Sequence, residues 1–184
     1  MKTAIIVLVI VAVVCGIGYI SMRNSLVNLD EAVNNSWAQV ETVLQRRYDL
    51  IPNLVNTVKG YAQHEKGVLE EVTRLRSQWG AAKTTTEKVD AANQLEGVLS
   101  KLLMVSENYP DLKANQNFIA LQDELSGTEN RIAVERRRFN DAVKEYNAAI
   151  RRFPTSIVAG RMALEKRNYF EAATGAASAP KVEF

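Results

Sequence analysis

The sequence is poor in the residues from which most catalytic and metal sites are built. It contains one cysteine and one histidine in 184 residues, too few for an internal disulfide, a zinc site of soft ligands or a Cys–His catalytic pair. Only 9 glycines and 4 prolines occur, which argues against an all-β fold built on many tight turns. No Gly-rich phosphate loop or nucleophile elbow is visible. The sequence alone does not exclude a catalytic pair of carboxylates contributed by two different helices. These absences disfavour most enzyme chemistries.

A large excess of charge of either sign is also missing. The 23 basic and 21 acidic residues give a net charge of +2, which provides no general attraction to nucleic acid or to acidic substrates. Apolar residues make up 47% and charged residues 24%, the proportions of a folded chain. The length suits one domain with a tail. We therefore expect no enzyme activity, no metal or other cofactor, and no nucleic acid partner.

The apolar residues are concentrated near the amino terminus. The seventeen residues from Ala4 to Ile20 carry no charge, and eleven of them are Ile, Leu or Val. At ~1.5 Å rise per residue, the twenty residues from Thr3 to Met22 would span about 30 Å, the thickness of a hydrocarbon core. This stretch predicts a membrane-spanning helix. The anchor residues that we single out are Ala4, Ile10, Ala12, Gly16 and Ile20.

A cleaved signal peptide is the alternative interpretation of this segment. Gly16 and Gly18 form a small-x-small pair before Tyr19, but the apolar run continues through Ile20, which weakens the cleavage signal. We favour a retained anchor. Ala12 and Gly16 have the spacing at which small residues let two membrane helices pack closely.

The charges that flank the anchor barely choose its orientation. Lys2 lies on the amino-terminal side, while Arg23 on the other side is opposed by Asp30 and Glu31. Positive charge within reach of the membrane is therefore nearly balanced, and the positive-inside rule decides little. We favour a very short amino-terminal tail with the larger part of the chain exported.

Beyond the anchor, apolar residues recur at helical spacing. No glycine or proline lies between Arg23 and Pro52, so we expect the membrane helix to continue into this stretch as a stalk. Pro52 would remove one helical hydrogen bond, and it could kink a long helix or mark a sharp turn. A kink would give three long helices and a turn would give four. The absence of glycine near Pro52 favours the kink.

Three further helical stretches are predicted by periodicity and end signals, and the first of them continues the stalk if Pro52 is a kink. One runs from Leu54 to Trp79, with Gly80 as its stop signal. The next follows Thr84 and Glu87, which have the spacing of a capping box. The last and clearest covers about residues 115–153.

The apolar seam of that last helix is too long for the preceding helix to cover. The stalk or another copy of the chain must cover the rest, because soluble monomers rarely expose a long apolar strip. We therefore predict a homo-oligomer, in which Trp37 and Leu44 face a neighbour. The candidate assembly or packing residues are Trp37, Leu44, Pro52, Phe139 and Tyr146.

Two motifs resemble functional sites, but each also has an interpretation without a function. Arg136, Arg137 and Arg138 could bind phosphates or lipid headgroups, but a solvated helix face balanced by Glu135 is the interpretation that we favour. The pair His64-Glu65 is reminiscent of a zinc-protease motif, yet no second histidine exists, so we predict no metal site.

Long ordered blocks of the sequence carry a family resemblance. The first block is residues 45–55, followed by Tyr61 and His64-Glu65; the second begins at Tyr109 and continues to Phe153-Pro154; the chain closes on residues 180–184. Together these blocks, over about residues 20 to 184, resemble the LemA family of bacterial membrane proteins. The resemblance implies an amino-terminal membrane helix and an up-and-down bundle of the four-helix type, without an established biochemical activity. Some relatives are associated with intracellular membrane organelles, which indicates membrane organisation.

We therefore expect an all-α chain with three parts. Residues 1–23 form the transmembrane anchor, 24–166 the LemA-like helical bundle, and 167–184 a tail. The tail carries apolar residues at both ends, Tyr169 and Phe170 at one and Val182 and Phe184 at the other. We expect it to bind back on the bundle or on a neighbouring copy.

The expected function is that of a non-enzymatic, self-assembling scaffold anchored in a bacterial inner membrane by a single pass, with the bundle on the periplasmic side. Its expected partners are the bilayer, further copies of the chain and an unidentified protein. The alternative is an accessory or sensing subunit that regulates a membrane enzyme or binds a small ligand. Its mark would be a polar layer in the bundle around Glu135 and Asn130.

Overall fold

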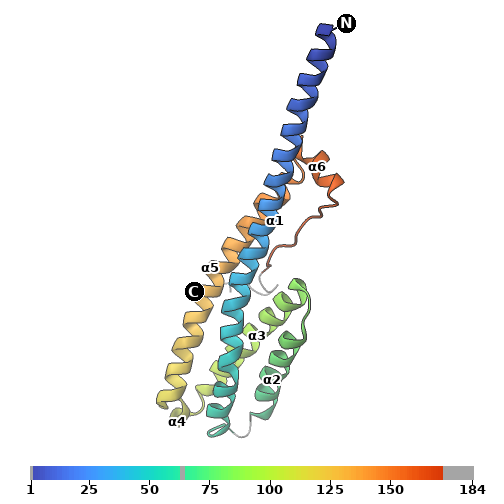
Figure 1. Ribbon diagram of the computed structural model, residues 1–184. Coiled ribbons are helices and arrows are strands. Elements are labelled where there is room, and N and C mark those ends of the chain that lie inside the picture. The colour runs from blue at the N-terminus through green and yellow to red at the C-terminus, as the bar shows by residue number, and fades with distance from the viewer. Residues whose placement is uncertain (1, 63–64, 172–184) are drawn as a thin grey trace, which may run out of the picture. The chain divides into compact units, whose positions relative to one another are not determined.

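The computed structural model describes residues 2–62 and 65–171, and every regular element in these ranges is a helix. The all-α prediction is confirmed, including a long apolar helix at the amino terminus (Figure 1). The elements in chain order are α1 (Lys2–Lys59), α2 (Lys66–Ala81), α3 (Thr85–Ser106), α4 (Pro110–Lys113), α5 (Gln116–Ala149) and α6 (Thr155–Arg161).

The chain divides into two compact units. Among the described residues, unit 1 consists of 2–39 and 135–169, and unit 2 consists of 40–62, 65–134 and 170–171. Helices α1 and α5 each contribute residues to both units, whereas α2, α3 and α4 belong to unit 2 and α6 belongs to unit 1. Each unit has its own buried side chains, and the single bundle expected over 24–166 stays a prediction.

Helices α1, α2, α3 and α5 contribute buried apolar side chains to unit 2, in agreement with their predicted periodicity, and α4 adds the buried Leu112. Helices α2 and α3 lie side by side (Figure 1). The predicted capping box at the start of α3 is confirmed: the Glu87 amide donates to Thr84 Oγ1 at 3.2 Å, and the Thr84 amide donates to Glu87 Oε2 at 3.1 Å. The core includes Leu44, Ile51 and Leu54 of α1, Val72 and Leu75 of α2, Leu95 and Leu102 of α3, and Phe118 and Leu125 of α5.

The prediction of one helix from Leu54 to Trp79 is wrong. Helix α1 continues through Pro52 to Lys59, and α2 begins only at Lys66. Pro52 therefore lies inside a continuous helix and does not mark a turn. The break falls directly after Lys59, at Gly60, since glycine is a poor helix former. The amides of Tyr61 and Ala62 both donate to the carbonyl of Val58, which closes the final turn of α1.

Unit 1 is built from the amino-terminal part of α1, the carboxyl-terminal part of α5, and α6. Trp37 and Phe139 meet edge to face, with ring centroids 5.4 Å apart. Helix α5 ends at Ala149 rather than near Phe153. The chain then turns into α6, whose Val158 and Ala159 are buried. The sequence patterns did not predict α6.

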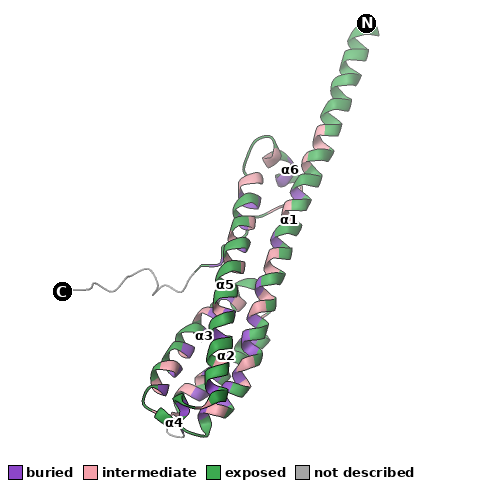
Figure 2. Cartoon of the chain, turned by 90° about the vertical axis from the view of Figure 1, so that its left-hand side faces the viewer, coloured by how far each residue is buried: buried purple, intermediate pink, exposed green. Residues whose placement is uncertain are grey.

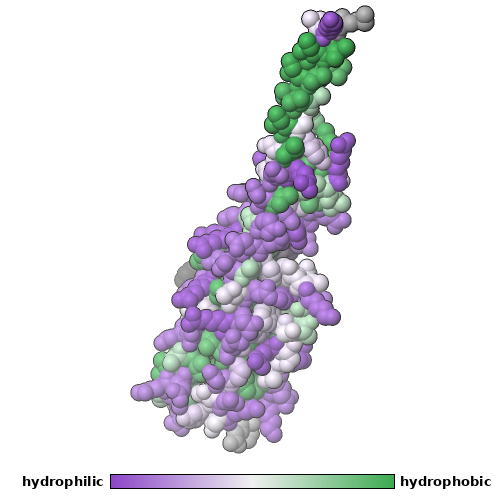
Figure 3. All heavy atoms as spheres, in the orientation of Figure 1, coloured by the Kyte–Doolittle hydropathy of each residue, from purple (hydrophilic) through white to green (hydrophobic). Residues whose placement is uncertain are grey.

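The apolar segment of α1 has no covering within its own unit. Among the described residues, α1 is the one helix that is long and apolar enough to cross a membrane. None of its most apolar stretch is buried. Figure 2 shows this end of α1 as uniformly exposed, and Figure 3 shows it as the most hydrophobic part of the visible surface. A fully exposed run of Ile, Leu and Val is unfavourable in water and suits a bilayer.

Candidate functional site

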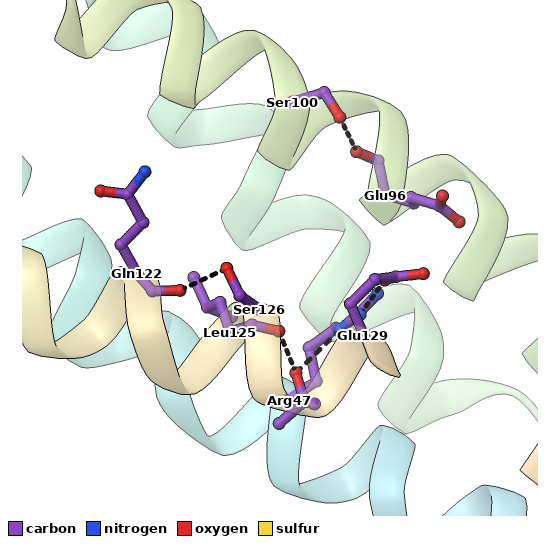
Figure 4. Close-up of polar contacts among 8 residues, drawn as sticks. Arg47, Glu96, Ser100, Gln122, Leu125, Ser126 and Glu129 are labelled. Atoms are coloured by element: carbon purple, nitrogen blue, oxygen red, sulfur yellow. Dashed lines mark hydrogen bonds and ion pairs between the residues drawn. The ribbon is translucent and has the colours of Figure 1, made fainter. Parts of the chain in front are cut away.

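A buried arginine lies in the core of unit 2. Arg47 of α1 is only 4% exposed. Its Nε donates to Thr128 Oγ1 at 3.4 Å, and its Nη2 forms an ion pair with Glu129, so both partners come from α5 (Figure 4). The Thr128 hydroxyl in turn donates to the carbonyl of Leu125 at 2.7 Å. A buried charge is costly unless it is paired, so these contacts specify how α1 and α5 meet within unit 2.

A pocket of about 300 Å³ opens beside Arg47. This volume is at the lower end of the range for small-molecule sites. Its floor includes Leu54 and Leu102, and its polar rim includes Glu96, Ser100, Gln122, Glu129 and Asn130.

Three of the polar side chains that line the pocket, those of Ser100, Ser126 and Glu129, already have partners. The Ser100 hydroxyl donates to the carbonyl of Glu96 at 3.0 Å, and the Ser126 hydroxyl donates to the carbonyl of Gln122 at 2.9 Å (Figure 4). Glu129 is held by Arg47. The arrangement can therefore hold a small, mostly apolar molecule, with one guanidinium at its edge.

The structure brings only half of the predicted polar layer together. Asn130 lines the pocket, whereas Glu135 belongs to unit 1 and accepts a hydrogen bond from Arg138 Nη1 at 2.8 Å. The sequence interpretation missed Arg47. Its signal was a charged residue at a core-facing helical position, three residues after Leu44 and four before Ile51.

The three consecutive arginines do not form one face. Arg136 is half-buried and has a contact of its own, while Arg137 and Arg138 are exposed. Arg138 is paired with Glu135. The phosphate-binding interpretation of this triplet stays a prediction that gains no supporting geometry.

Most of the candidate assembly residues pack inside their own chain. Leu44 is buried in unit 2, and Phe139 and Tyr146 are buried in unit 1. Trp37 is half-buried against Phe139, and Pro52 is half-buried within α1. Leu44 therefore cannot face a neighbouring copy as expected. Because each unit buries its own part of the α5 seam, the seam does not require a second copy.

Residues of the described part of the tail bind back within the unit to which each of them belongs. In unit 1, Asn147 forms two hydrogen bonds of 2.9 Å with the backbone of Arg167, and Arg167 Nη2 pairs with Asp30 Oδ1 at 2.9 Å. In unit 2, Phe170 is buried and Asn93 Nδ2 donates to the carbonyl of Glu171 at 3.1 Å. Val182 and Phe184 lie outside the described residues.

The remaining candidates are the metal motif and the anchor. His64 lies outside the described residues, and within residues 2–62 and 65–171 no cluster of three potential metal ligands occurs. A side chain added at Gly16 would meet nothing within 4 Å. The anchor residues are all exposed, namely Ala4, Ile10, Ala12, Gly16 and Ile20.

Comparison with known proteins adds a family match. The model of the LemA family matches residues 36–184. Protein LemA of Metamycoplasma hominis is 25% identical over 155 residues, which cover 84% of this chain and 71% of the relative. Magnetosome protein MamQ 2 of Paramagnetospirillum magneticum is 24% identical over 195 residues, covering 91% and 72%. Magnetosome protein MamQ of Magnetospirillum gryphiswaldense is 23% identical over 173 residues, covering 80% and 64%.

Proposed function

We propose that this chain, which belongs to the LemA family, is a non-enzymatic helical scaffold anchored in a membrane, where it organises membrane or partner proteins. The observation that carries the proposal is the fully exposed apolar segment of α1, which continues without a break into the packed part of the same helix. The relatives named as magnetosome proteins support a role at a membrane.

The scaffold crosses a bacterial inner membrane once, with its packed units on the periplasmic side. One spanning helix among the described residues supports the single pass. The charges that flank the span are nearly balanced, so they do not oppose export of the larger part.

Copies of the scaffold assemble in the plane of the membrane. The α5 seam is buried within its own units, so we assign self-association to the anchor instead of the seam. Small residues at positions 12 and 16 would let two spans approach closely. Confinement to one membrane raises the local concentration and lowers the cost of association.

Native mass spectrometry of the full chain, released from membranes in a mild detergent, tests this assembly. We expect multiples of the 20.5 kDa chain. Gly16→Ile should reduce them to single copies by separating the spans, whereas Val14→Ile on the opposite side of the helix should leave them unchanged. A single copy throughout the micromolar range would contradict assembly, and release of the chain by an alkaline carbonate wash would contradict the anchor itself.

A second candidate function is that of an accessory or sensing subunit, and the pocket beside Arg47 favours it. A small organic anion with an apolar body would fit this pocket. Thermal unfolding of the full chain in detergent, with a panel of small aliphatic and aromatic carboxylates, tests the idea. Ser100→Phe should fill the pocket and abolish any increase in melting temperature, while Ser77→Phe on the exposed side of α2 should not. No increase with any member of the panel would argue against this function.

A further inference from the structure

We propose that the segment from the end of α5 into α6, residues 150–162, docks on the surface of the bilayer that holds the anchor and binds the headgroups of anionic phospholipids. We call it the α5–α6 segment. The proposal rests on the proposed function in one respect, because it requires that the apolar part of α1 spans the membrane.

The packing of unit 1 fixes the height of the α5–α6 segment along α1. Val158 and Ala159 of α6 form a buried cluster with Leu26, and Tyr19 and Met22 pack against it. Figure 1 shows α6 beside α1, next to the end of its bare segment. Met22 is the last residue of the twenty that match the bilayer thickness, and Leu26 lies one helical turn further on. The α5–α6 segment therefore lies at the level of the lipid headgroups.

Two large apolar side chains of this segment point away from the cluster. Phe153 is 81% exposed and Ile157 is 55% exposed. Ile157 and Arg161 are four residues apart and share a face of α6, while Val158 and Ala159 face α1. Phe153 and Ile157 would be unfavourable in water, yet at this height they can insert into the boundary between headgroups and acyl chains.

The charge of the segment is of one sign. Residues 149–164 contain Arg151, Arg152 and Arg161 but no aspartate or glutamate. Among the described residues, no carboxylate forms an ion pair with any of these three guanidinium groups, whereas Arg167 of the same unit is paired with Asp30.

Arginines beside exposed apolar side chains are the composition of helices that lie in a membrane interface. Near an anionic bilayer, each arginine should favour docking by about fivefold, the equivalent of about 1 kcal/mol. The bilayer is also the partner that every anchored copy already has at this height.

Depth-dependent fluorescence quenching of the full chain in liposomes tests the proposal. The native cysteine is first removed by Cys15→Ser, since it is the only one. A fluorophore is then attached through Ile10→Cys, Phe153→Cys, Ile157→Cys or Asp141→Cys, each in a separate variant. All four positions are exposed, so the labels leave the buried cores intact.

The four positions should respond differently to quenchers carried by the lipids. Position 10 should be quenched by a quencher deep in the acyl chains, and positions 153 and 157 by one just below the headgroups. Position 141, on α5, should be quenched by neither. The quenching at 153 and 157 should increase when phosphatidylglycerol is added to phosphatidylcholine vesicles.

A charge variant tests the headgroup contact. Arg151→Gln, Arg152→Gln and Arg161→Gln together should reduce quenching at position 157 in phosphatidylglycerol vesicles to its level in phosphatidylcholine. The matched control, Arg131→Gln, Arg137→Gln and Lys144→Gln, removes the same charge from exposed positions elsewhere and should change nothing.

The outcomes separate this inference from the proposed function. Quenching at position 10 without quenching at 153 and 157 would overturn the inference and leave the anchor intact. No quenching at position 10 would overturn both. Quenching at 153 that appears only at high protein-to-lipid ratios would identify a neighbouring copy as the occupant and overturn the lipid contact. Equal quenching with and without phosphatidylglycerol would overturn the role of the arginines.

Discussion

Tyr48 places a hydroxyl in the core of unit 2 without a hydrogen-bond partner. The side chain is almost fully buried, and its ring stacks on Trp79 with centroids 4.4 Å apart. Neither Tyr48 Oη nor Trp79 Nε1 has a hydrogen-bond partner among the described residues. Burial raises the pKa of Tyr48 far above its ordinary value, although the charge of Arg47 partly opposes this effect. The stacking stabilises unit 2, and the buried hydroxyl destabilises it.

Replacing Tyr48 with phenylalanine should therefore stabilise the protein. Tyr48→Phe keeps the stacked ring and should raise the free energy of unfolding by about 1 kcal/mol, because it removes an unsatisfied polar group. The unfolded chain ionises Tyr48 near pH 10, whereas the folded chain keeps it neutral. In the wild type, the free energy of unfolding therefore does not depend on the ionisation of Tyr48 below pH ~10. It decreases as the pH rises above that value, because the unfolded chain then releases the Tyr48 proton more readily than the folded chain.

Urea unfolding at neutral pH and above pH ~10 checks both effects. The Tyr48→Phe variant should lose less stability than the wild type over this interval. Tyr169→Phe, at an exposed position, is the control and should behave like the wild type. A variant that is less stable than the wild type at neutral pH would mean that the hydroxyl has a partner, such as bound water.

At the scale of single residues, the sequence predicted apolar burial better than polar burial. Phe139 and Tyr146 lie at helical spacing and are buried, as their pattern predicts. The burial of Arg47 depends on Thr128 and Glu129, which follow it by 81 and 82 residues. Local sequence patterns do not reveal which residues so far apart in the chain will pair. The candidate pocket was therefore only partly predictable, through Asn130.

At the scale of elements, local signals predicted what local interactions determine. The start of α3 was predictable because Thr84 and Glu87 satisfy each other within four residues. Helix α6 was not, because a helix of 7 residues is not stable alone and depends on packing against α1. The turn at Gly60 was missed because apolar residues keep helical spacing on both sides of it.

The end of α6 contains an alanine where glycine is usual. The Leu164 amide donates to the carbonyl of Ala159 at 3.1 Å and the Ala163 amide to that of Gly160 at 3.2 Å, the pattern of a Schellman motif. Ala163 takes a φ of 51°, in the left-handed region. A side chain there costs about 1 kcal/mol or more relative to glycine.

Ala163→Gly should therefore raise the free energy of unfolding by about 0.5 to 1 kcal/mol, after allowance for the greater freedom of glycine in the unfolded chain. Thermal unfolding in detergent measures the change. The control is Ala142→Gly, the same substitution inside α5, which should lower the free energy by a similar amount. If both variants lose stability, the left-handed conformation at 163 is not a source of strain.

At the scale of the whole molecule, α1 serves two different environments. Residues 2–17 are exposed, and Figure 2 colours this end of α1 as exposed. From Tyr19 to Leu26 it packs against α6 in unit 1. Packing in unit 1 therefore begins near Gly18, within the twenty residues that match the bilayer thickness and several residues before the charge at Arg23 that suggested a boundary in the sequence.

Two amino-terminal deletions test where this packing begins. Deleting residues 2–18 removes only the apolar segment, so the remaining chain should be water-soluble, with the helix content per residue and melting temperature of the detergent-extracted protein. Deleting residues 2–26 also removes Tyr19, Met22 and Leu26, which uncovers Val158 and Ala159. The loss of one buried leucine alone costs about 2 to 5 kcal/mol.

Circular dichroism and limited trypsin digestion measure the difference between the two deletions. The longer deletion should speed cleavage at Arg161 in α6, while cleavage at Arg137 in α5 serves as the internal control. Equal cleavage rates at Arg161 in the two variants would mean that α6 does not depend on α1, and its height at the membrane would then be undetermined.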